Sequence, residues 1–396
     1  FDSDRLEDSE VKLGYGYSKQ TIARLHNGKW AVVMGNGYAA NGSTNGKASL
    51  LIIDMETGEL TDELIVQGTE GVANGMSTPK LADVNADGIA DFAYAGDLQG
   101  NVWRFDLARA ASSSYPNDPF KRTMEPRQGE SVDFQVSFGG RPLFSAVDKD
   151  GNRQPVTAAP SIIRHPTNNG YIIAVGTGRY YTEGDKGGVS GSKQSIYGVW
   201  DPTTKEPRST SKSGFPFTTV TRSRLQEQIM GVDDVPLESN PGIKDKGARI
   251  LSDYAVSWAV KTKNGWNTTS NSKVGWYFDL PLDKEMIVAD MLQFGRTLYF
   301  QSLIPNADPC ASGVDNWTYA INPATGGRTS HHAWTDYRRE GDSGHVITAV
   351  KMDGEGGISI GQRADKKYEL CTGGMCNTIT PDPASLGRQS WREVEE

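Results

Sequence analysis

The feature that most constrains the fold is a loose repeat of β-strands that recurs along nearly the whole chain. Each unit has an apolar strand, a tight polar turn, a second apolar strand and a third strand that ends in Asp or Asn. The clearest six units lie within 20–60, 77–107, 158–202, 256–281, 286–327 and 345–361. Runs such as 30–34 and 171–175 are rich in the β-branched and aromatic residues that favour strands. Asn27-Gly28 suits a hairpin turn because both residues accept a positive φ.

Units of three to four antiparallel strands that recur every ~40 to 50 residues indicate a β-propeller. One unit alone buries too little apolar surface, so neighbouring units must stack to form the core. The 45 Gly, 15 Tyr, 12 Phe and 9 Trp of the 396 residues also favour strands and turns over helices. A pair of β-sandwiches is the rival architecture. Because the units span the chain without a linker, we predict an all-β fold with residues 1–396 forming one β-propeller domain.

The repeat is irregular, with long insertions near 108–150, 182–195 and 202–250. Within the last insertion, the segment 222–230 places Leu225, Ile229 and Met230 at helical spacing. This spacing predicts a short surface helix that packs on the domain.

Charge and hydropathy exclude several classes of protein. The net charge is −8, and no basic block occurs, which argues against binding to nucleic acid or to an anionic membrane surface. No apolar run approaches the ~20 residues that a membrane-spanning helix needs. The acidic opening FDSDRLEDSE has no initiator Met, so we expect the chain to be the C-terminal fragment of a larger protein.

The segment LADVNADGIADF (81–92) contains the most specific candidate site. Asp83, Asn85 and Asp87 alternate along the loop, followed by Ile89, which offers its carbonyl, and then by Asp91. Oxygen ligands at alternate positions are typical of calcium-binding loops, in which a central glycine permits the turn. An EF-hand would close with Glu at position 12, where this chain has Tyr94. The alternative is a solvated, Asp-rich turn without a metal.

Calcium is the ion that this ligand set favours. A flexible cage of protein oxygens suits calcium better than magnesium, which usually retains water. The loop contains no His or Cys, so zinc and copper are disfavoured. A cation held by three carboxylates leaves little room for a substrate, and a catalytic metal needs an open position. We therefore expect a structural or regulatory calcium ion, and a protein that is not an enzyme.

The chain has three cysteines. Cys371 and Cys376 lie in CTGGMC, whose Gly-Gly turn could bring the two sulfurs together at the end of a hairpin. A disulfide is the favoured interpretation, with two reduced thiols as the alternative. Cys310 is left over, either free or paired outside this chain.

Two other polar motifs are interpreted as parts of loops or turns without a catalytic or metal-binding role. His331 and His332 have no nucleophile motif near them, so we interpret them as loop residues. The segment VDKDGN (147–152) has Asp148, Asp150 and Asn152 at ligand-like spacing but lacks a closing acid. It is interpreted as a hairpin turn.

Several of these segments together resemble one family. The segments WAVVMGNGY, LLIIDMETGEL, VGTGRYY and NPATGGR, together with the stretch from GMSTPKLADVNADGIADF to GDLQGNVWRFDL, are similar to the C-terminal domain of the PilY-type, type IV pilus-associated tip adhesins. The resemblance covers almost the entire chain and is weakest through 202–285.

The resemblance implies a modified, quinoprotein-like seven-bladed β-propeller with Ca²⁺ at Asp83, Asn85, Asp87, Ile89 and Asp91. It implies that calcium occupancy sets the balance between pilus extension and retraction, and with it twitching motility and surface attachment. The implied location is the cell surface, at the pilus tip or outer membrane, after export. The implied partners are pilus components such as minor pilins, with host or abiotic surfaces as further partners.

Two alternatives remain. The spacing from Ile52 to Gly58 resembles the repeats of quinoprotein dehydrogenase propellers, which also use calcium. Those enzymes typically hold the quinone over a Trp floor and often contain a disulfide between adjacent cysteines, which this sequence lacks. A glycan-binding propeller is the third interpretation. It is compatible with the many aromatic residues but has no specific motif.

Overall fold

The computed structural model describes most of the repeat units. It describes residues 11, 13–16, 18–38, 44–108, 133–181, 185, 193–204, 214–231, 247–263, 265–305, 314–335, 346–352 and 357–382. Cys310 and large parts of the three predicted insertions lie outside these residues. No helix among them is long and apolar enough to cross a membrane.

The first two repeat units form the first two sheets, as the sequence predicts. One sheet has the order β1 (Thr21–Arg24), β2 (Trp30–Gly35), β3 (Lys47–Asp54) and β4 (Leu60–Gln67). The second has the order β5 (Lys80–Ala82), β6 (Phe92–Gly96), β7 (Asn101–Asp106) and β8 (Gln135–Val136), and β9 (Phe144–Ser145) also pairs with β7. All these pairs are antiparallel. The short element α1 (Ser137–Gly140) includes two residues in the left-handed region and is not a regular helix.

Two larger sheets follow. The third sheet has the order β10 (Ser161–Arg164), β11 (Tyr171–Gly176), β12 (Ser195–Asp201), β18 (Gly275–Asp279) and β13 (Gln226–Glu227). The fourth has the order β14 (Met230–Gly231), β15 (Ala248–Leu251), β22 (Ile347–Lys351), β21 (Val314–Ile321), β20 (Thr297–Pro305) and β19 (Leu292–Phe294). Two small sheets contain β16 (Val260–Thr262) with β17 (Gly265–Asn267), and β23 (Ser359–Gln362) with β24 (Tyr368–Thr372) and β25 (Met375–Ile379).

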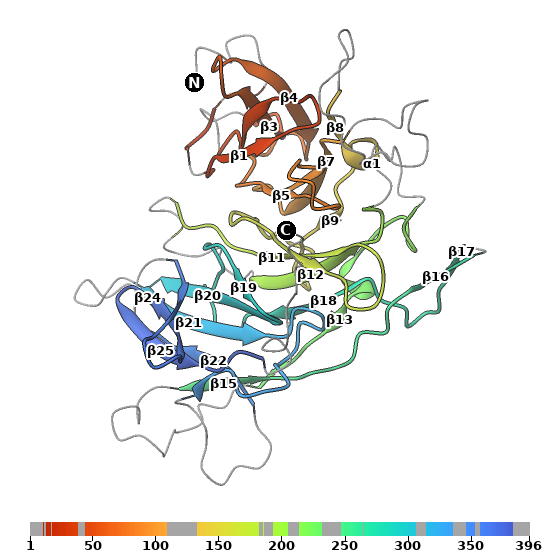
Figure 1. Cartoon of the computed structure of the whole chain (residues 1–396). Coiled ribbons are helices and arrows are strands. Elements are labelled where there is room, and N and C mark those ends of the chain that lie inside the picture. Colours follow the sequence, from red (N-terminus) through yellow and green to blue (C-terminus); the bar gives the residue numbers. More distant parts are fainter. Residues whose placement is uncertain are drawn as a thin grey trace, which may run out of the picture.

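The predicted fourth unit, 256–281, is not a sheet of its own. Its last strand, β18, pairs with β12 of the third sheet, while β16 and β17 form a separate two-stranded ribbon (Figure 1). Trp276 and Phe278 of β18 are fully buried in the core beside the third sheet. Burial of these large side chains therefore determines which sheet the strand joins.

The predicted helix over 222–230 is wrong. The segment has one 3₁₀ turn, η5 (Arg222–Arg224), followed by β13, which pairs in parallel with β18, and then by β14. Leu225 is buried, whereas Ile229 is 56% exposed, so the two side chains do not share an apolar helical face. Pairing with the edges of two sheets replaces the helical hydrogen bonds.

Hydrophobic cores lie between successive sheets. One cluster joins the first sheet to the second, and another joins the second to the third. A third cluster lies between the third sheet and the fourth, and the last joins the fourth to β24 and β25. Figure 1 shows the first two sheets grouped at one end, in red to gold, with the later strands beyond them. Sheets that pack face to face in chain order are typical of a propeller.

Candidate functional site

The predicted calcium loop connects β5 to β6, two paired strands of the second sheet. Asp83 holds the turn, because its two carboxylate oxygens accept hydrogen bonds from the backbone N–H groups of Asp87 (3.2 Å) and Gly88 (2.7 Å). Asp87 in turn accepts the N–H of Ile89 at 2.9 Å. The side chain of Asn85 donates to Asp87 at 3.2 Å. The first part of the loop is therefore folded around its own acidic side chains.

The backbone of the loop reverses at two residues with positive φ. These are Ala86 (φ 59°) and Gly88 (φ 84°). Gly88 has no steric penalty in this region, whereas a residue with a Cβ would be strained there. The sequence argument for a glycine at the centre of the loop therefore agrees with the backbone.

Asp91 differs from the other two acids because it is fully buried. One carboxylate oxygen accepts the backbone N–H of Val84 at 2.7 Å, and the other contacts Nε2 of His26 at 2.8 Å. Burial raises the pKa of Asp91, and the hydrogen bonds from His26 and Val84 only partly oppose this effect. Burial thus disfavours the charged form of this carboxylate more than its two hydrogen bonds favour it.

His26 is the residue that sequence reasoning missed. It lies in the turn between β1 and β2 of the first sheet and is itself buried. The backbone also links the two sheets here, because the N–H of Ala90 donates to the carbonyl of Arg24 at 3.0 Å. Only the adjacent Asn27-Gly28 turn marks this position in the sequence. The first sheet thus anchors the C-terminal end of the loop.

The structure brings the acids into one loop but does not bring their oxygens into a closed cluster. Among the described residues, the only group of three or more His, Cys, Asp or Glu ligand atoms within 4.8 Å of one another is formed by Glu369, Cys371 and Cys376. Within the same residues, no Lys or Arg forms an ion pair with Asp83, Asp87 or Asp91. The ligand chemistry still fits a hard cation, since carboxylate and amide oxygens without a neighbouring cation are what calcium binds.

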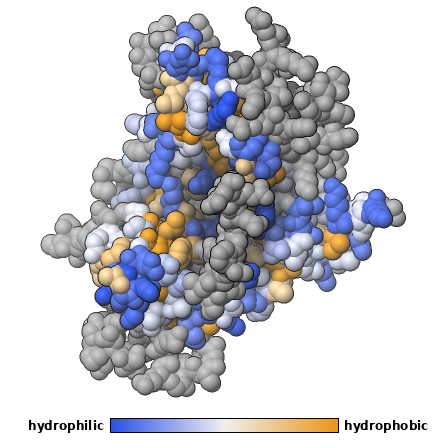
Figure 2. All heavy atoms as spheres, viewed as in Figure 1, coloured by the Kyte–Doolittle hydropathy of each residue, from blue (hydrophilic) through white to orange (hydrophobic). Residues whose placement is uncertain are grey.

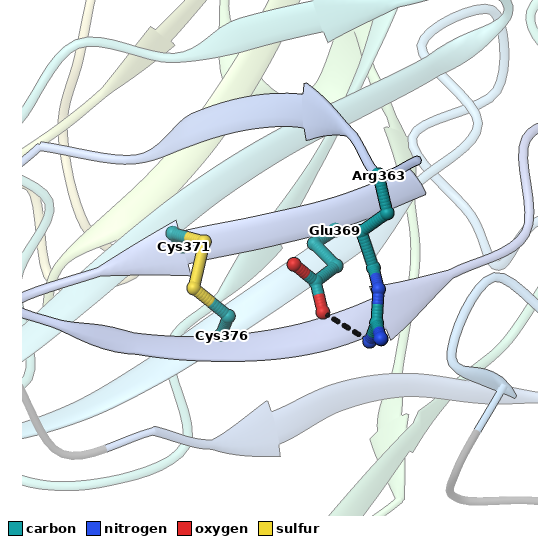
Figure 3. The surroundings of a disulfide bond; sticks show 4 residues. All are labelled: Arg363, Glu369, Cys371 and Cys376. Carbon is teal, nitrogen blue, oxygen red and sulfur yellow. Dashed lines mark hydrogen bonds and ion pairs between the residues drawn. A yellow bond between two sulfur atoms is a disulfide. The ribbon is translucent and has the colours of Figure 1, made fainter. Parts of the chain in front are cut away.

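The group around Cys371 is a disulfide. Cys371 and Cys376 face each other across β24 and β25, with their Cα atoms 4.1 Å apart and their sulfurs bonded (Figure 3). Glu369 points to Arg363, with which it forms an ion pair at 2.8 Å. Because bonded sulfurs are not thiolates, this group is not a metal site.

The two histidines of the sequence analysis lie in an irregular segment, as predicted. Nε2 of His331 contacts the carbonyl of Thr380 at 3.0 Å. Burial lowers the pKa of His331, which keeps the imidazole neutral.

A second polar group lies wholly inside the core. Arg104 of β7 forms ion pairs with Asp106 (3.0 Å) and with Asp201 of β12 (2.9 Å). The guanidinium is also 4.4 Å from the ring centres of both Phe92 and Phe138. All five side chains are completely or almost completely buried, so this group joins the second sheet to the third and offers no access to a substrate.

Comparison with known proteins places the chain in a family. The profile of the PilY1 beta-propeller domain matches residues 2–237. The chain is 44% identical over 98% of its length to the type IV pilus biogenesis factor PilY1 of Pseudomonas aeruginosa PAO1, and spans 33% of that protein. It is 28% identical over 98% of its length to a PilY1 homolog of Xylella fastidiosa, and spans 26% of that protein.

A solved structure shows the same fold. The crystal structure of the Pseudomonas aeruginosa PilY1 C-terminal domain aligns with a TM-score of 0.80 and 41% identity. The alignment covers 95% of this chain and 74% of that one. The chain thus spans about a third or less of the length of these curated relatives, and 98% of its own length aligns with them. It belongs to the PilY1 β-propeller domain family.

Proposed function

We propose that this domain is the calcium-binding regulatory propeller of a type IV pilus tip adhesin, and that it controls pilus extension against retraction. The observation that supports it is the loop from Asp83 to Asp91, which carries three carboxylates and no basic ion-pair partner among the described Lys and Arg residues. Its relatives bear the name of type IV pilus biogenesis factors. On this proposal the protein is exported, acts at the cell surface and is not an enzyme.

The loop can act as a switch because its two ends differ. Asp91 is fixed in the core by His26 and Val84, whereas Asn85 and Gly88 are exposed. A bound calcium ion would be held by Asp83, Asn85, Asp87, Asp91 and the carbonyl of Ile89. It would supply the positive charge that removes repulsion among the carboxylates. In its absence, the exposed half of the loop should open while the sheets, which have their own cores, persist.

We expect that pilus components, such as minor pilins, respond to a change in the surface exposure of this loop. Twitching motility and attachment to host or abiotic surfaces would then follow from the number of extended pili. We also propose that residues 1–396 act as one propeller domain, which the continuous series of cores between successive sheets supports.

The test is made in bacteria that carry the full-length parent protein. Asp91→Ala removes the buried ligand and should mimic the calcium-free state. Asp91→Lys places an ammonium group beside the remaining acids and should mimic the calcium-bound state. Surface pilus number and twitching are measured with the retraction machinery present and absent. The two variants should have opposite phenotypes.

Because Asp91 is buried, Asp87→Ala serves as a second calcium-free variant in the more accessible part of the loop. If Asp87→Ala, Asp91→Ala, Asp91→Lys and the wild type all gave the same phenotype, the regulatory role would be wrong. Unfolding of Asp87→Ala by circular dichroism would show instead that calcium is needed for folding, and the switch would be abandoned.

A further inference from the structure

The two-stranded ribbon β16–β17 projects from the body of the domain and is held by few contacts. Figure 1 shows it extending beyond the other strands, and among the described strands β16 and β17 pair only with each other. The described ribbon residues, 260–263 and 265–267, are all exposed except Trp266, which is half-buried. Figure 2 shows this projection as mainly hydrophilic surface. The ring of Trp266 is therefore the ribbon's main apolar contact with the rest of the domain.

The tryptophans of the ribbon segment cover a buried histidine and the tryptophan beside it. His165, in the turn after β10, is 3% exposed, with ring centres 4.3 Å from Trp258 and 4.6 Å from Trp200. Trp200 meets Trp258 and Trp266 edge to face, at 5.8 and 5.5 Å. We call these four residues the aromatic box. Trp200 is buried in β12, whereas Trp258 and Trp266 are half-buried, so the ribbon segment forms the movable side of the box.

The hydrogen bonds of His165 require the neutral imidazole. Nδ1 accepts the backbone N–H groups of Thr167 (3.2 Å) and Asn168 (2.9 Å). The neutral ring therefore carries its proton on Nε2, which is buried and has no hydrogen-bond partner among the described residues. Protonation would place a hydrogen on Nδ1, directly facing two donors. The imidazolium would then have no acceptor at either nitrogen as long as the box is closed.

The surroundings of the box do not favour a charged ring. The titratable residues next to the box are Arg164, Tyr171, Asp201, Lys261 and Lys273. Asp201 is paired with Arg104 at 2.9 Å. Burial lowers the pKa of His165 to about 4. The indole faces attract a cation, but they cannot replace the two hydrogen bonds that Nδ1 loses.

We propose that His165 is an acid-sensitive latch, which holds the ribbon β16–β17 on the domain at neutral pH and releases it when the imidazole is protonated. The charged ring needs water and an acceptor for its Nδ1–H, and it reaches them only when the box opens. Because Trp200 is fixed in the core, Trp258 and Trp266 move away with the ribbon while the sheets persist. The domain then presents these two indole rings as an additional surface in acid only.

The size of the effect follows from proton linkage. An exposed imidazole has a pKa of ~6.5, above the value in the closed box, so below this pH the open state binds the extra proton and is favoured. Lowering the pH from 7.5 to 5 should therefore raise the ratio of open to closed molecules about 30-fold. None of the proposed calcium ligands belongs to the box, so excess calcium is kept present throughout to hold the loop in one state.

The experiment is hydrogen exchange of the whole chain, read by mass spectrometry at pH 7.5 and pH 5 and corrected for the intrinsic pH dependence of exchange. The reporters are the N–H groups of Thr167 and Asn168, which bond to Nδ1, and those of Ala259 and Lys273 at the base of the ribbon. Their opening should increase about 30-fold at pH 5. It should depend only weakly on urea, because a local opening exposes little surface.

Two results would overturn the latch. One is an opening of these segments that does not change with pH. The other is an opening with the full urea dependence of global unfolding, which would show that the ribbon does not separate from the domain by itself.

Variants assign the effect to the box. His165→Asn keeps an oxygen acceptor for Thr167 and Asn168 but does not titrate, so its pH effect should shrink to within about 2-fold. Trp266→Ala removes the ring that docks the ribbon, and Lys273 should then exchange rapidly at both pH values in a domain that is folded by circular dichroism. His332→Asn, at a half-buried histidine outside the box, is the matched control and should keep the pH effect of the wild type.

The latch would be wrong if His165→Asn kept the full pH effect, because another group would then be the acid sensor. It would also be wrong if Trp266→Ala retained the protection of the wild type at pH 7.5, because the aromatic box would then not hold the ribbon.

Discussion

Two Asp-rich turns of this protein look alike in sequence but differ in how their charges are compensated. The loop 83–91 and the turn 148–152 both place acids and Asn at alternate positions around a glycine. In the second turn, Asp148 accepts the N–H groups of Asp150 (2.9 Å) and Asn152 (2.8 Å), and also the side-chain amide of Asn152 (2.9 Å). Val147 and Arg153 pair across its ends, so the turn is the predicted hairpin.

The pKa values of the two buried acids shift in opposite directions. Burial acts to raise the pKa of Asp148, but the hydrogen bonds from Asn152 and Asp150 and the charge of Arg222 outweigh it, and the pKa is lowered. Burial of Asp91 outweighs its bonds with His26 and Val84, and its pKa is raised. Hydrogen bonds within the turn, together with Arg222, stabilise the charged form of Asp148, whereas the two bonds to the Asp91 carboxylate do not offset its burial. Spacing alone does not distinguish the two; local compensation of charge does.

The largest difference is expected in calcium affinity. Asp91→Ala removes a carboxylate from the proposed ligand set and should weaken calcium binding by about 100-fold or more. Asp148→Ala, in the self-satisfied turn, should leave the affinity within about 2-fold. Titration calorimetry of both variants checks this. Equal effects of the two substitutions would remove the distinction between the turns.

Calcium should also stabilise the folded domain. Since the ion binds only the folded loop, calcium at 100 times its Kd should raise the free energy of unfolding by about 2.7 kcal/mol. Magnesium at the same concentration should have a much smaller effect. Thermal melts after EDTA treatment, with each ion restored, measure this. If calcium raised the melting temperature of Asp91→Ala as much as that of the wild type, the ion would bind at another site.

His165 provides an acid-sensitive group outside both turns. It is buried against Trp200 and Trp258, and burial lowers its pKa to about 4. Below pH ~6.5 the unfolded state takes up a proton that the folded state does not, so stability falls as the pH drops toward 4. Between pH 7.5 and pH 5 this loss is about 2 kcal/mol.

The control for this effect is His165→Asn. The asparagine oxygen can still accept the N–H groups of Thr167 and Asn168, which Nδ1 of His165 now accepts at 3.2 and 2.9 Å. Between pH 7.5 and pH 5, the free energy of unfolding measured in urea should fall by about 2 kcal/mol less in this variant than in the wild type. An unchanged acid loss would show that His165 is not its source.

His26 should affect the calcium affinity of the loop without itself binding the ion. Residues that orient a ligand typically change metal affinity 10- to 100-fold, so His26→Gln should weaken calcium binding about 10-fold. The variant should remain folded at saturating calcium by circular dichroism. An affinity equal to that of the wild type would show that the contact between His26 and Asp91 does not position the carboxylate.

The smallest effect is expected at Asp148. Asp148→Asn keeps one oxygen acceptor but places an NH₂ donor opposite the side-chain amide of Asn152. It should lower the free energy of unfolding by about 1 kcal/mol at neutral pH. Because the folded-state pKa of Asp148 is lowered, this contribution is present above the unfolded pKa and is lost as the pH falls through the folded value. Wild type and variant should therefore converge at low pH in urea unfolding. A constant difference at all pH values would contradict the pKa assignment.

The sequence by itself determined the local features. β-Branched runs, Asn-Gly turns and the glycine of the acidic loop depend on residues close in the chain, so strands such as β2 and β11 and the reversal at Gly88 follow directly. The ligand spacing from Asp83 to Asp91 and the resemblance to the PilY family are also contained in the order of residues.

The tertiary structure decided which distant residues meet. The partner of β18 and the contact of His26 with Asp91 join segments that are far apart in the chain. The segment 222–230 had a helical pattern, yet pairing with β18 and β15 outweighed its weak local propensity. Burial and pairing energies depend on the whole arrangement of sheets, and no local pattern encodes them.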